Sequence, residues 1–410
     1  MSLPTCRHCG SALERVFLDL GHAPPSNAYL QPEALNAPEL TFPLRLRVCD
    51  NCHLVQTEDF TEADKLFAAD YAYFSSTSKS WLDHAARYAL MVTDRFALGA
   101  DSLVIEVASN DGYLLKNFVA AGIPCLGIEP TEGTARAAEA LGIPVLREFF
   151  GEALGRSLAQ EGRRADLIAG KNVYAHVPDI NDFTRGLAAA LKPEGVITLE
   201  FPHLMRLVES CQFDTVYHEH FSYLSLISVR HIFAAAGLRV FDVEELPTHG
   251  GSLRVFGCHA AAAHQTTAAA DAVLAEERAR GMETAAYYEG FQARAGAVKN
   301  GLLRFLLDAA RDGHSVAAYG AAAKGNTLLN YAGVKPDLLP FVCDAAPSKQ
   351  GMLMPGSHIP ILPPEALVER RPDYVLILPW NIADEVQSQL SPLAAKGTRF
   401  VTAVPEIRVR

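Results

Sequence analysis

The chain lacks any apolar stretch of the ~18 residues that a membrane span needs, although 49% of its 410 residues are hydrophobic. Its first ten residues, MSLPTCRHCG, also lack the charged segment followed by an apolar one that marks a secretory signal. We therefore expect a cytoplasmic protein that makes no contact with a membrane.

Positive charge is scarce too, and the formal net charge is −11. Binding to nucleic acid needs a basic surface that faces the phosphates, so this composition excludes nucleic acid as a partner. A local basic patch could still bind a small anionic ligand. The length predicts two or three domains.

Half of the eight cysteines lie in two Cys-x-x-Cys pairs near the N-terminus, which are Cys6, Cys9, Cys49 and Cys52. Two such pairs in a cytosolic protein predict a four-thiolate zinc site. A closed tetrahedral site of this kind is structural, and it stabilises a module too small for a large core. The alternative, two redox or disulfide pairs, is disfavoured by a reducing compartment.

The pattern divides the chain into a zinc-binding module (1–75), a core (76–264) and a C-terminal domain (265–410). The core alternates strands and helices, with strands at 102–108, 124–130, 165–173 and 196–202, helices at 111–122 and 134–142, and a helix followed by a turn at 183–195. Such alternation predicts an α/β fold with a doubly wound parallel sheet, whose ligands bind at the carboxyl ends of the strands.

The C-terminal segment opens with a long helical pattern that is broken at Gly281. It then repeats the order strand, glycine-containing turn and helix. We therefore expect a second, smaller Rossmann-like domain at the C-terminus.

The turn after the first core strand indicates the cofactor. It reads Glu106-Val-Ala-Ser-Asn-Asp-Gly112, and Glu129 ends the next strand, where an acidic residue binds a ribose diol. Ala108 and Asn110 stand in this turn and G-x-G-x-x-G is absent, which argues against a nicotinamide cofactor. A phosphate-free cation, S-adenosylmethionine, suits this turn better. Phe149, after the next strand-like run, could flank the adenine, and Asn172 completes the candidate cofactor-binding set.

Four polar residues stand together in YHEH, residues 217–220. His218 and His220 are two apart, which is not the i, i+4 helical pair of a metal site. If the segment is a strand, the two histidines share a face. Two interpretations stay open: polar residues on a solvated strand, or a proton-handling centre.

Seven motifs in this order resemble the three-domain sugar-nucleotide C-methyltransferases of unusual deoxysugar pathways. They are the doublet of Cys-x-x-Cys pairs, YAYFSSTSKSWLDH (71–84), EVASNDG (106–112), KNVYAHVPD (171–179), YHEHFSYLS (217–225), HGGSLR (249–254) and YGAAAKGNTLLN (319–330). The resemblance spans nearly the whole chain. It implies a zinc module, a class I methyltransferase core with S-adenosylmethionine, and a Rossmann-like C-terminal domain. Ala108 departs from the family, which more usually has glycine there.

The resemblance also implies a reaction, methylation at carbon 3 of a dTDP-linked 4-keto-6-deoxysugar. A base must remove the proton that the ketone acidifies, and a base that titrates near neutrality favours histidine. The family pattern Tyr-x-Glu-His supports His220 as this base, with Glu219 orienting it or contacting the sugar. Tyr217 and His176 are candidates for a hydrogen bond to the enolate oxygen, and Tyr73 could close the site. For His176, simple packing against the sheet is the alternative.

A sugar nucleotide also needs a site for its diphosphate. The turn at 319–327 follows a strand and opens a helix, so its backbone N–H groups and Lys324 could hold phosphate, with Asn326 and Thr327 beside them. Its alternative is a Rossmann turn that binds nothing. Ser252 and Arg254 are further candidates, Arg254 for a bidentate contact with phosphate, and the alternative for Arg254 is a surface strand residue.

Other functions stay open from the sequence. An O- or N-methyltransferase acting on a related sugar nucleotide would need no keto group. A scaffold could bind zinc and nucleotide without catalysis. An NAD-dependent epimerase or dehydrogenase is disfavoured by the missing G-x-G-x-x-G. We expect a small-molecule substrate and favour a monomer.

Overall fold

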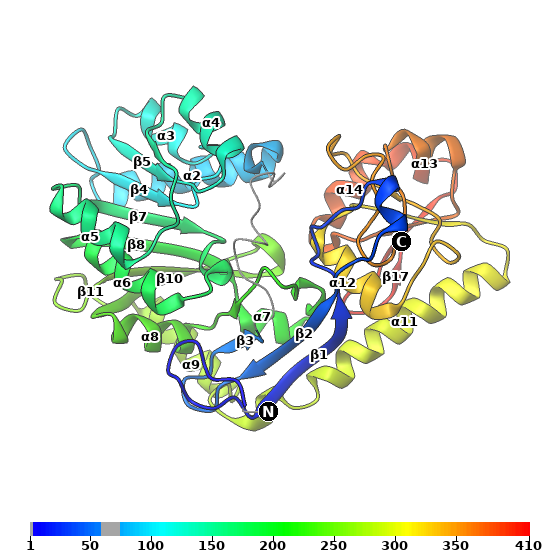
Figure 1. Cartoon of the computed structure of the whole chain (residues 1–410), viewed down its shortest axis with the longest axis horizontal. Coiled ribbons are helices and arrows are strands. Elements are labelled where there is room, and N and C mark those ends of the chain that lie inside the picture. The colour runs from blue at the N-terminus through cyan, green and yellow to red at the C-terminus, as the bar shows by residue number, and fades with distance from the viewer. Residues whose placement is uncertain (1–2, 59–73) are drawn as a thin grey trace.

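A computed structural model of the chain describes residues 3–58 and 74–410 and arranges them around three β-sheets (Figure 1). The core lies on the left of this view and the C-terminal domain on the right, with the first two strands below and between them. Among the described residues, no helix is long and apolar enough to cross a membrane.

The core sheet has seven strands in the order β10-β11-β8-β7-β4-β5-β6. The strands are β4 (Val104–Val107), β5 (Cys125–Ile128), β6 (Val145–Leu146), β7 (Ala165–Lys171), β8 (Leu191–Pro202), β10 (Leu238–Leu246) and β11 (Ser252–His259). Neighbouring strands from β6 to β8 are parallel, whereas β11 runs antiparallel to both β8 and β10. The predicted doubly wound α/β sheet is confirmed, with one reversed strand near its edge.

Helices cover both faces of this sheet, which is why β4 is buried along its whole length. The helices of the core are α2 (Lys79–Arg95), α3 (Leu115–Ala120), α4 (Glu132–Ala140), α5 (Glu152–Gln160), α6 (Ile180–Ala190), α7 (Leu204–Glu209) and α8 (Leu226–Ala235). The helix predicted within 183–195 ends at Ala190, and β8 begins at once where a turn was expected. Pro193 helps to end the helix, because proline disfavours a helical residue before it.

The C-terminal sheet has six strands in the order β14-β13-β12-β15-β16-β17. They are β12 (Val316–Tyr319), β13 (Val342–Cys343), β14 (Ile361–Leu362), β15 (Tyr374–Ile377), β16 (Arg399–Thr402) and β17 (Arg408–Val409), and only β17 pairs antiparallel. Its helices are α12 (Ala323–Ala332), α13 (Glu365–Arg370), α14 (Ala383–Gln389) and α15 (Ser391–Ala394). This is the second Rossmann-like domain that the sequence predicted.

The long helical pattern between the two domains forms α9 (Ala268–Ala279), α10 (Ala285–Tyr288) and α11 (Phe291–Arg311). Gly281 ends the first of these in a left-handed conformation, as predicted. α9 contacts α8 and β10 of the core, while α11 contacts α12 and the first strand of the chain. The division of the chain at residues 75 and 264 stays a prediction.

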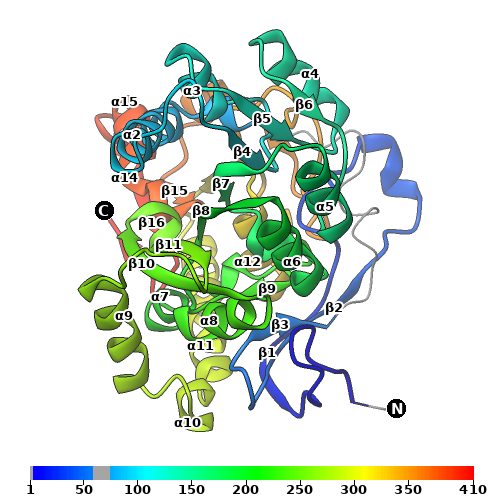
Figure 2. The ribbon, with the colours of Figure 1, turned by 90° about the vertical axis from the view of Figure 1, so that its left-hand side faces the viewer.

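The N-terminal sheet takes its last strand from the core. Its order is β1 (Arg15–Ala23), β2 (Phe42–Val48), β3 (Val55–Thr57) and β9 (Ser222–Tyr223). Val55 pairs with Tyr223 in antiparallel register, so the strand that follows YHEH belongs to the zinc module's sheet (Figure 2). The N-terminal module therefore constrains the segment in which we expect the catalytic residues.

Candidate active site and metal centre

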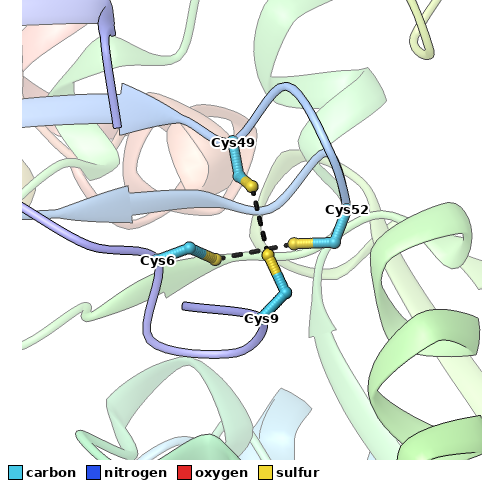
Figure 3. Close-up of side chains that lie close together, drawn as sticks. All are labelled: Cys6, Cys9, Cys49 and Cys52. Carbon is cyan, nitrogen blue, oxygen red and sulfur yellow. Dashed lines mark hydrogen bonds between the residues drawn. The ribbon is translucent and has the colours of Figure 1, made fainter. Parts of the chain in front are cut away.

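The four predicted zinc ligands converge at one point (Figure 3). The Sγ atoms of Cys6 and Cys52 lie 3.5 Å apart, as do those of Cys9 and Cys49, and all four lie within 4.8 Å of one another. Tetrahedral zinc with bonds of about 2.3 Å separates its sulfur ligands by about 3.8 Å. The cluster therefore fits a structural Zn²⁺ ion with no position left for chemistry.

The metal centre is connected to the core through neighbouring hydrogen bonds. Gln56 donates from Nε2 to Cys6 Sγ (3.2 Å) and accepts from the Arg7 backbone N–H (2.8 Å). Next along the chain, the Thr57 N–H donates to the Phe221 carbonyl (3.1 Å). The cysteine cluster thus stabilises the strand beside the YHEH segment.

One cavity of about 1650 Å³ is lined by all three parts of the chain. The N-terminal module contributes Asn27, and the C-terminal domain contributes Lys324 and Trp380. The core contributes residues after the carboxyl ends of its parallel strands, among them Glu129 and His176. Ligands of doubly wound sheets bind at this edge.

The turn after β4 has the backbone of a glycine-rich loop with only one glycine. Ala108, Asn110 and Gly112 all have positive φ values, of 56°, 49° and 78°. This conformation directs the Asn110 N–H to Glu129 Oε2 (2.9 Å). Ala108 and Asn110 line the cavity. Gly112 does not line it, and a Cβ at this position would lie 2.4 Å from the Ile143 side chain, so close packing requires the glycine.

Two acidic residues shape this end of the cavity. Glu106 is fully buried under the turn and does not itself line the cavity, and the Tyr113 side chain hydrogen-bonds to its carboxyl group. Burial raises its pKa well above the ordinary value, and nearby Lys171 opposes this. Glu129 lines the cavity itself, and its Oε1 accepts from the Thr131 N–H (3.0 Å).

The remaining cofactor candidates also line the cavity. The Phe149 side chain is 62% exposed at its rim. Asn172 has a φ of 54° and its Nδ2 donates to His249 Nε2 (3.0 Å). His249 also lines the cavity and was not predicted from the sequence, and burial lowers its pKa to about 4.

YHEH is a turn, so the strand that one of the two interpretations assumed is not present. The His220 N–H bonds back to the Tyr217 carbonyl (3.0 Å), because β-pairing with β3 begins only at Ser222. His218 Nε2 therefore lies against the Phe42 and Pro43 carbonyls, at 3.3 Å from each. Of these two histidines, His220 lines the cavity and His218 does not. The structure thus separates two side chains that the alternation of a strand would have placed on one face.

The His220 imidazole is held as a neutral tautomer. Its Nδ1 lies 3.1 Å from the Thr215 carbonyl, which can only accept, so Nδ1 carries the proton and Nε2 keeps a lone pair. Burial lowers the pKa of His220 well below its ordinary value, and His176 adds to the effect. The His220 ring centroid lies 4.0 Å from that of Tyr217 and 4.5 Å from that of His176.

His176 and Tyr217 line the cavity beside His220. Burial lowers the pKa of His176 to about 4, so its ring is neutral at physiological pH. Tyr73, the predicted closing residue, lies outside the described residues.

Glu219 is clamped by a residue that the sequence did not indicate. Asn27 Nδ2 donates to both carboxylate oxygens, at 2.8 and 2.9 Å. Burial raises the pKa of Glu219 to about 7, although the bonds from Asn27 oppose this. Asn27 lies in a segment without periodicity, so no local pattern could have shown its contact with a residue of the core.

Lys324 is the cation of the C-terminal part of the cavity. Its Nζ donates to Asn381 Oδ1 (2.9 Å) and lies 4.8 Å from the Trp380 ring centroid. Burial lowers its pKa to about 8. Asn326 and Thr327 do not line the cavity. They are buried and donate to the Ser26 carbonyl (2.6 Å) and the Val216 carbonyl (2.8 Å), which joins the three parts of the chain.

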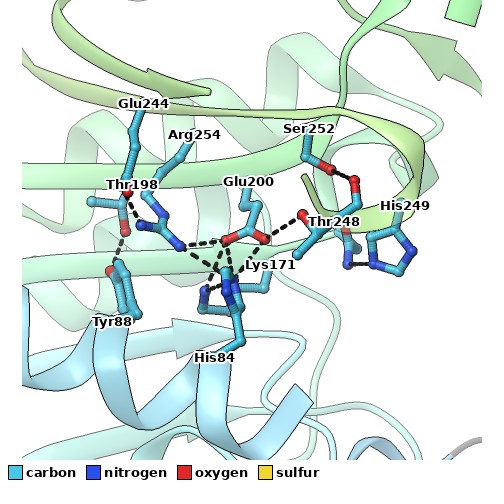
Figure 4. A network of polar contacts seen from close by, with 11 residues as sticks. His84, Tyr88, Lys171, Thr198, Glu200, Glu244, Thr248, His249, Ser252 and Arg254 are labelled. Carbon is cyan, nitrogen blue, oxygen red and sulfur yellow. Dashed lines mark hydrogen bonds and ion pairs between the residues drawn. The ribbon is translucent and has the colours of Figure 1, made fainter. Parts of the chain in front are cut away.

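Arg254 lies in a buried ion network (Figure 4). It donates to Glu200 (2.8 Å) and Glu244 (2.5 Å), while Lys171 and His84 also contact Glu200, at 2.8 and 2.9 Å. Arg254 lines the cavity, but its guanidinium is neutralised by two carboxylates and is poorly suited to a phosphate. Ser252 is buried away from the cavity and donates to the Thr248 carbonyl (2.9 Å).

Comparison with known proteins first defines the class. Residues 81–243 match a methyltransferase domain family, residues 6–67 a zinc binding domain family, and residues 247–405 the C-methyltransferase C-terminal domain family. With the strand order and the cavity described above, these matches make the protein an S-adenosylmethionine-dependent methyltransferase with a class I, Rossmann-like core and a zinc module.

The chain is 36% identical over 404 residues to the C-methyltransferase NovU of Streptomyces niveus, which covers 98% of this chain and 96% of that relative. It therefore belongs to this family of C-methyltransferases.

Solved structures resemble part of the chain. Magnesium protoporphyrin IX methyltransferase of Synechocystis is 15% identical, with a TM-score of 0.33 over 44% of this chain and 78% of its own. An S-adenosylmethionine-dependent methyltransferase of Clostridium acetobutylicum is 11% identical, with a TM-score of 0.35 over 48% and 95%.

Substitution of one zinc ligand should show that the cysteine cluster has a structural role. We expect the wild-type protein to carry about one zinc ion per chain, and Cys49→Ser to lose it and to unfold at a lower temperature. Metal analysis and thermal denaturation measure both effects. Cys125→Ser, at a single buried cysteine outside the cluster, is the control and should keep its zinc. Full zinc content in Cys49→Ser would contradict the assignment.

The left-handed conformation of Ala108 should be relieved by glycine. An L-residue in this region costs roughly 1–2 kcal/mol, offset by the larger chain entropy of glycine. We expect Ala108→Gly to stabilise the protein by about 0.5–1 kcal/mol in urea unfolding. Ala137→Gly, in helix α4, should destabilise it by a similar amount. Destabilisation by Ala108→Gly would show that the turn is not strained.

Glu219 should make stability depend on pH. Because its pKa is about 7 in the folded protein against 4.5 ordinarily, the folded state binds more protons between these values, and stability falls as pH rises through them. The loss is on the order of 3 kcal/mol. We expect Glu219→Gln to raise the melting temperature at pH 8.5 and not at pH 5. Exposed Glu289 is the control, and an equal effect of Glu289→Gln would refute the assignment.

Proposed function

We propose that this C-methyltransferase methylates carbon 3 of a nucleotide-linked 4-keto-deoxysugar, with a dTDP carrier. One observation carries the proposal: a single cavity is lined by the turn with Glu129, by neutral His220 and by Lys324. The first suits an adenosyl ligand, the second suits proton removal, and the third suits a diphosphate. The presence of all three in one space supports a substrate that carries both an acidic C–H bond and phosphate.

A carbon atom becomes nucleophilic when a neighbouring ketone acidifies its C–H bond. His220 Nε2 accepts the proton, and the electron pair of the broken bond moves into the enolate. Tyr217 lies beside His220 and would donate a hydrogen bond to the enolate oxygen. His176 also packs against His220 and helps to fix its ring. When bound, S-adenosylmethionine supplies an electrophilic methyl group to that carbon. Glu219, half-ionised near neutral pH, would hold a sugar hydroxyl.

In this proposal, the diphosphate of the substrate binds at Lys324 and the N-terminal end of α12. Ala322 and Ala323 line the cavity with Lys324, and their small side chains allow phosphate to approach the backbone. Trp380 presents a ring to the same space, on which a base or sugar could stack.

The reaction can be tested directly with isotopes. Incubation of a dTDP-4-keto-6-deoxysugar with ¹³C-methyl-labelled S-adenosylmethionine should give a product whose labelled methyl is bonded to carbon in NMR. A signal at an O- or N-methyl shift would overturn carbon as the acceptor.

Replacement of His220 should separate binding from turnover. We expect His220→Asn to bind S-adenosylhomocysteine as the wild type does in calorimetry, and to lose roughly 10²–10⁴-fold in turnover, as expected for a general base. His218→Asn is the matched control, because His218 lies outside the cavity, and its turnover should change little. A normal rate in His220→Asn would remove His220 as the base.

A further inference from the structure

The orientation of His220 depends on a short helix that precedes it, η4 (Phe213–Thr215). The Thr215 carbonyl, at the end of η4, holds the Nδ1 proton of His220. A shift of this carbonyl would turn the ring or change its tautomer. Whatever positions η4 therefore also positions the lone pair of the proposed base.

Asp214, in the middle of η4, is held by the C-terminal domain. Its side chain is fully buried, and Oδ2 accepts from the Trp380 indole N–H at 2.6 Å. The carboxyl group also interacts with its own backbone N–H and with the charge of Lys324. Trp380 thus provides a hydrogen bond of a buried carboxylate that belongs to another domain, and such charge-assisted bonds are strong.

Two neighbouring residues support the contact between Asp214 and Trp380. A Cβ at Gly250, in the HGGSLR motif, would lie 2.5 Å from Trp380 Cη2, and this residue has a φ of 89°. Thr327 of α12 bonds to the Val216 carbonyl. The C-terminal domain therefore holds the chain on both sides of Thr215, at Asp214 and at Val216.

The same tryptophan faces the proposed diphosphate site. Lys324 lies over its ring and bonds to the next residue, Asn381. The contact that holds η4 is therefore part of the surface on which we place the nucleotide.

We propose that Asp214 and Trp380 are positioning residues, whose contact aligns His220 only when the C-terminal domain is docked against the core. This inference rests on the proposed function and adds to it a link between the nucleotide-binding domain and the base. Neither residue need touch the reacting atoms. A misplacement of about 1 Å can cost about 10²-fold in rate, so loss of the contact should slow proton removal without affecting cofactor binding.

The test uses two variants of the full-length protein. Trp380→Phe keeps an aromatic ring but removes the indole N–H that donates to Asp214. Asp214→Asn keeps an acceptor oxygen and removes the negative charge. Asp166→Asn is the control, since Asp166 accepts from the Leu103 N–H (2.7 Å) and does not line the cavity. Calorimetry with S-adenosylhomocysteine counts the folded sites in each protein.

Proton removal can be followed alone, as deuterium exchange into the 4-keto sugar nucleotide in D₂O without S-adenosylmethionine. We expect exchange and kcat per folded site to fall together, by roughly tenfold or more in Trp380→Phe and by less in Asp214→Asn. The Kd for S-adenosylhomocysteine should stay within about twofold of wild type, and Asp166→Asn should behave as wild type.

Three results would overturn this inference: unchanged exchange in Trp380→Phe, a change confined to KM, or an equal loss in Asp166→Asn. If Asp214→Asn does not fold, Trp380→Phe decides alone. A wild-type protein that neither exchanges nor methylates the sugar nucleotide would overturn the proposed function instead, so the two failures are distinguishable.

Discussion

Hydrogen bonds from two outer parts of the chain hold one short segment of the core, residues 212–223. The N-terminal module contacts it through Asn27 and through pairing of β3 with β9, and the C-terminal domain through Trp380 and Thr327. Phe213, Val216 and Phe221 bury this segment in the core. The polar turn between them, residues 217–220, has little apolar area of its own, so contacts from outside help it to keep one conformation. The shape of the cavity, the positions of its titratable groups and the proposed reaction all depend on these contacts with residues 212–223.

Burial decides the charge states in this cavity. It lowers the pKa of His176 and His220, so both rings are neutral, and it raises the pKa of Glu219 to about 7. Excluding water from these groups also strengthens each interaction among them, because the local dielectric is low. The zinc module contributes at a distance, since its sheet forms one wall of the same segment.

The sequence predicted the fold well. Alternation of apolar and turn residues identified the strands and helices of both Rossmann-like domains, and Cys-x-x-Cys spacing identified the metal centre. It did not identify the turn at YHEH, which we had considered as a strand, because the pairing that follows the turn comes from β3 of another module. It also proposed Asn326, Thr327, Ser252 and Arg254 for ligand binding; each of them makes a hydrogen bond within the protein, and among them Arg254 lines the cavity.

By itself, the sequence determined the order of the elements, the thiolates of the zinc site and the acidic residues at the ends of β4 and β5, because these follow from local periodicity and spacing. Only the tertiary structure decided which histidine enters the cavity and which residues hold it there. Asn27 meets Glu219 across 192 residues and Asp214 meets Trp380 across 166. Such contacts arise from how domains pack against one another, and no pattern within a short segment encodes them.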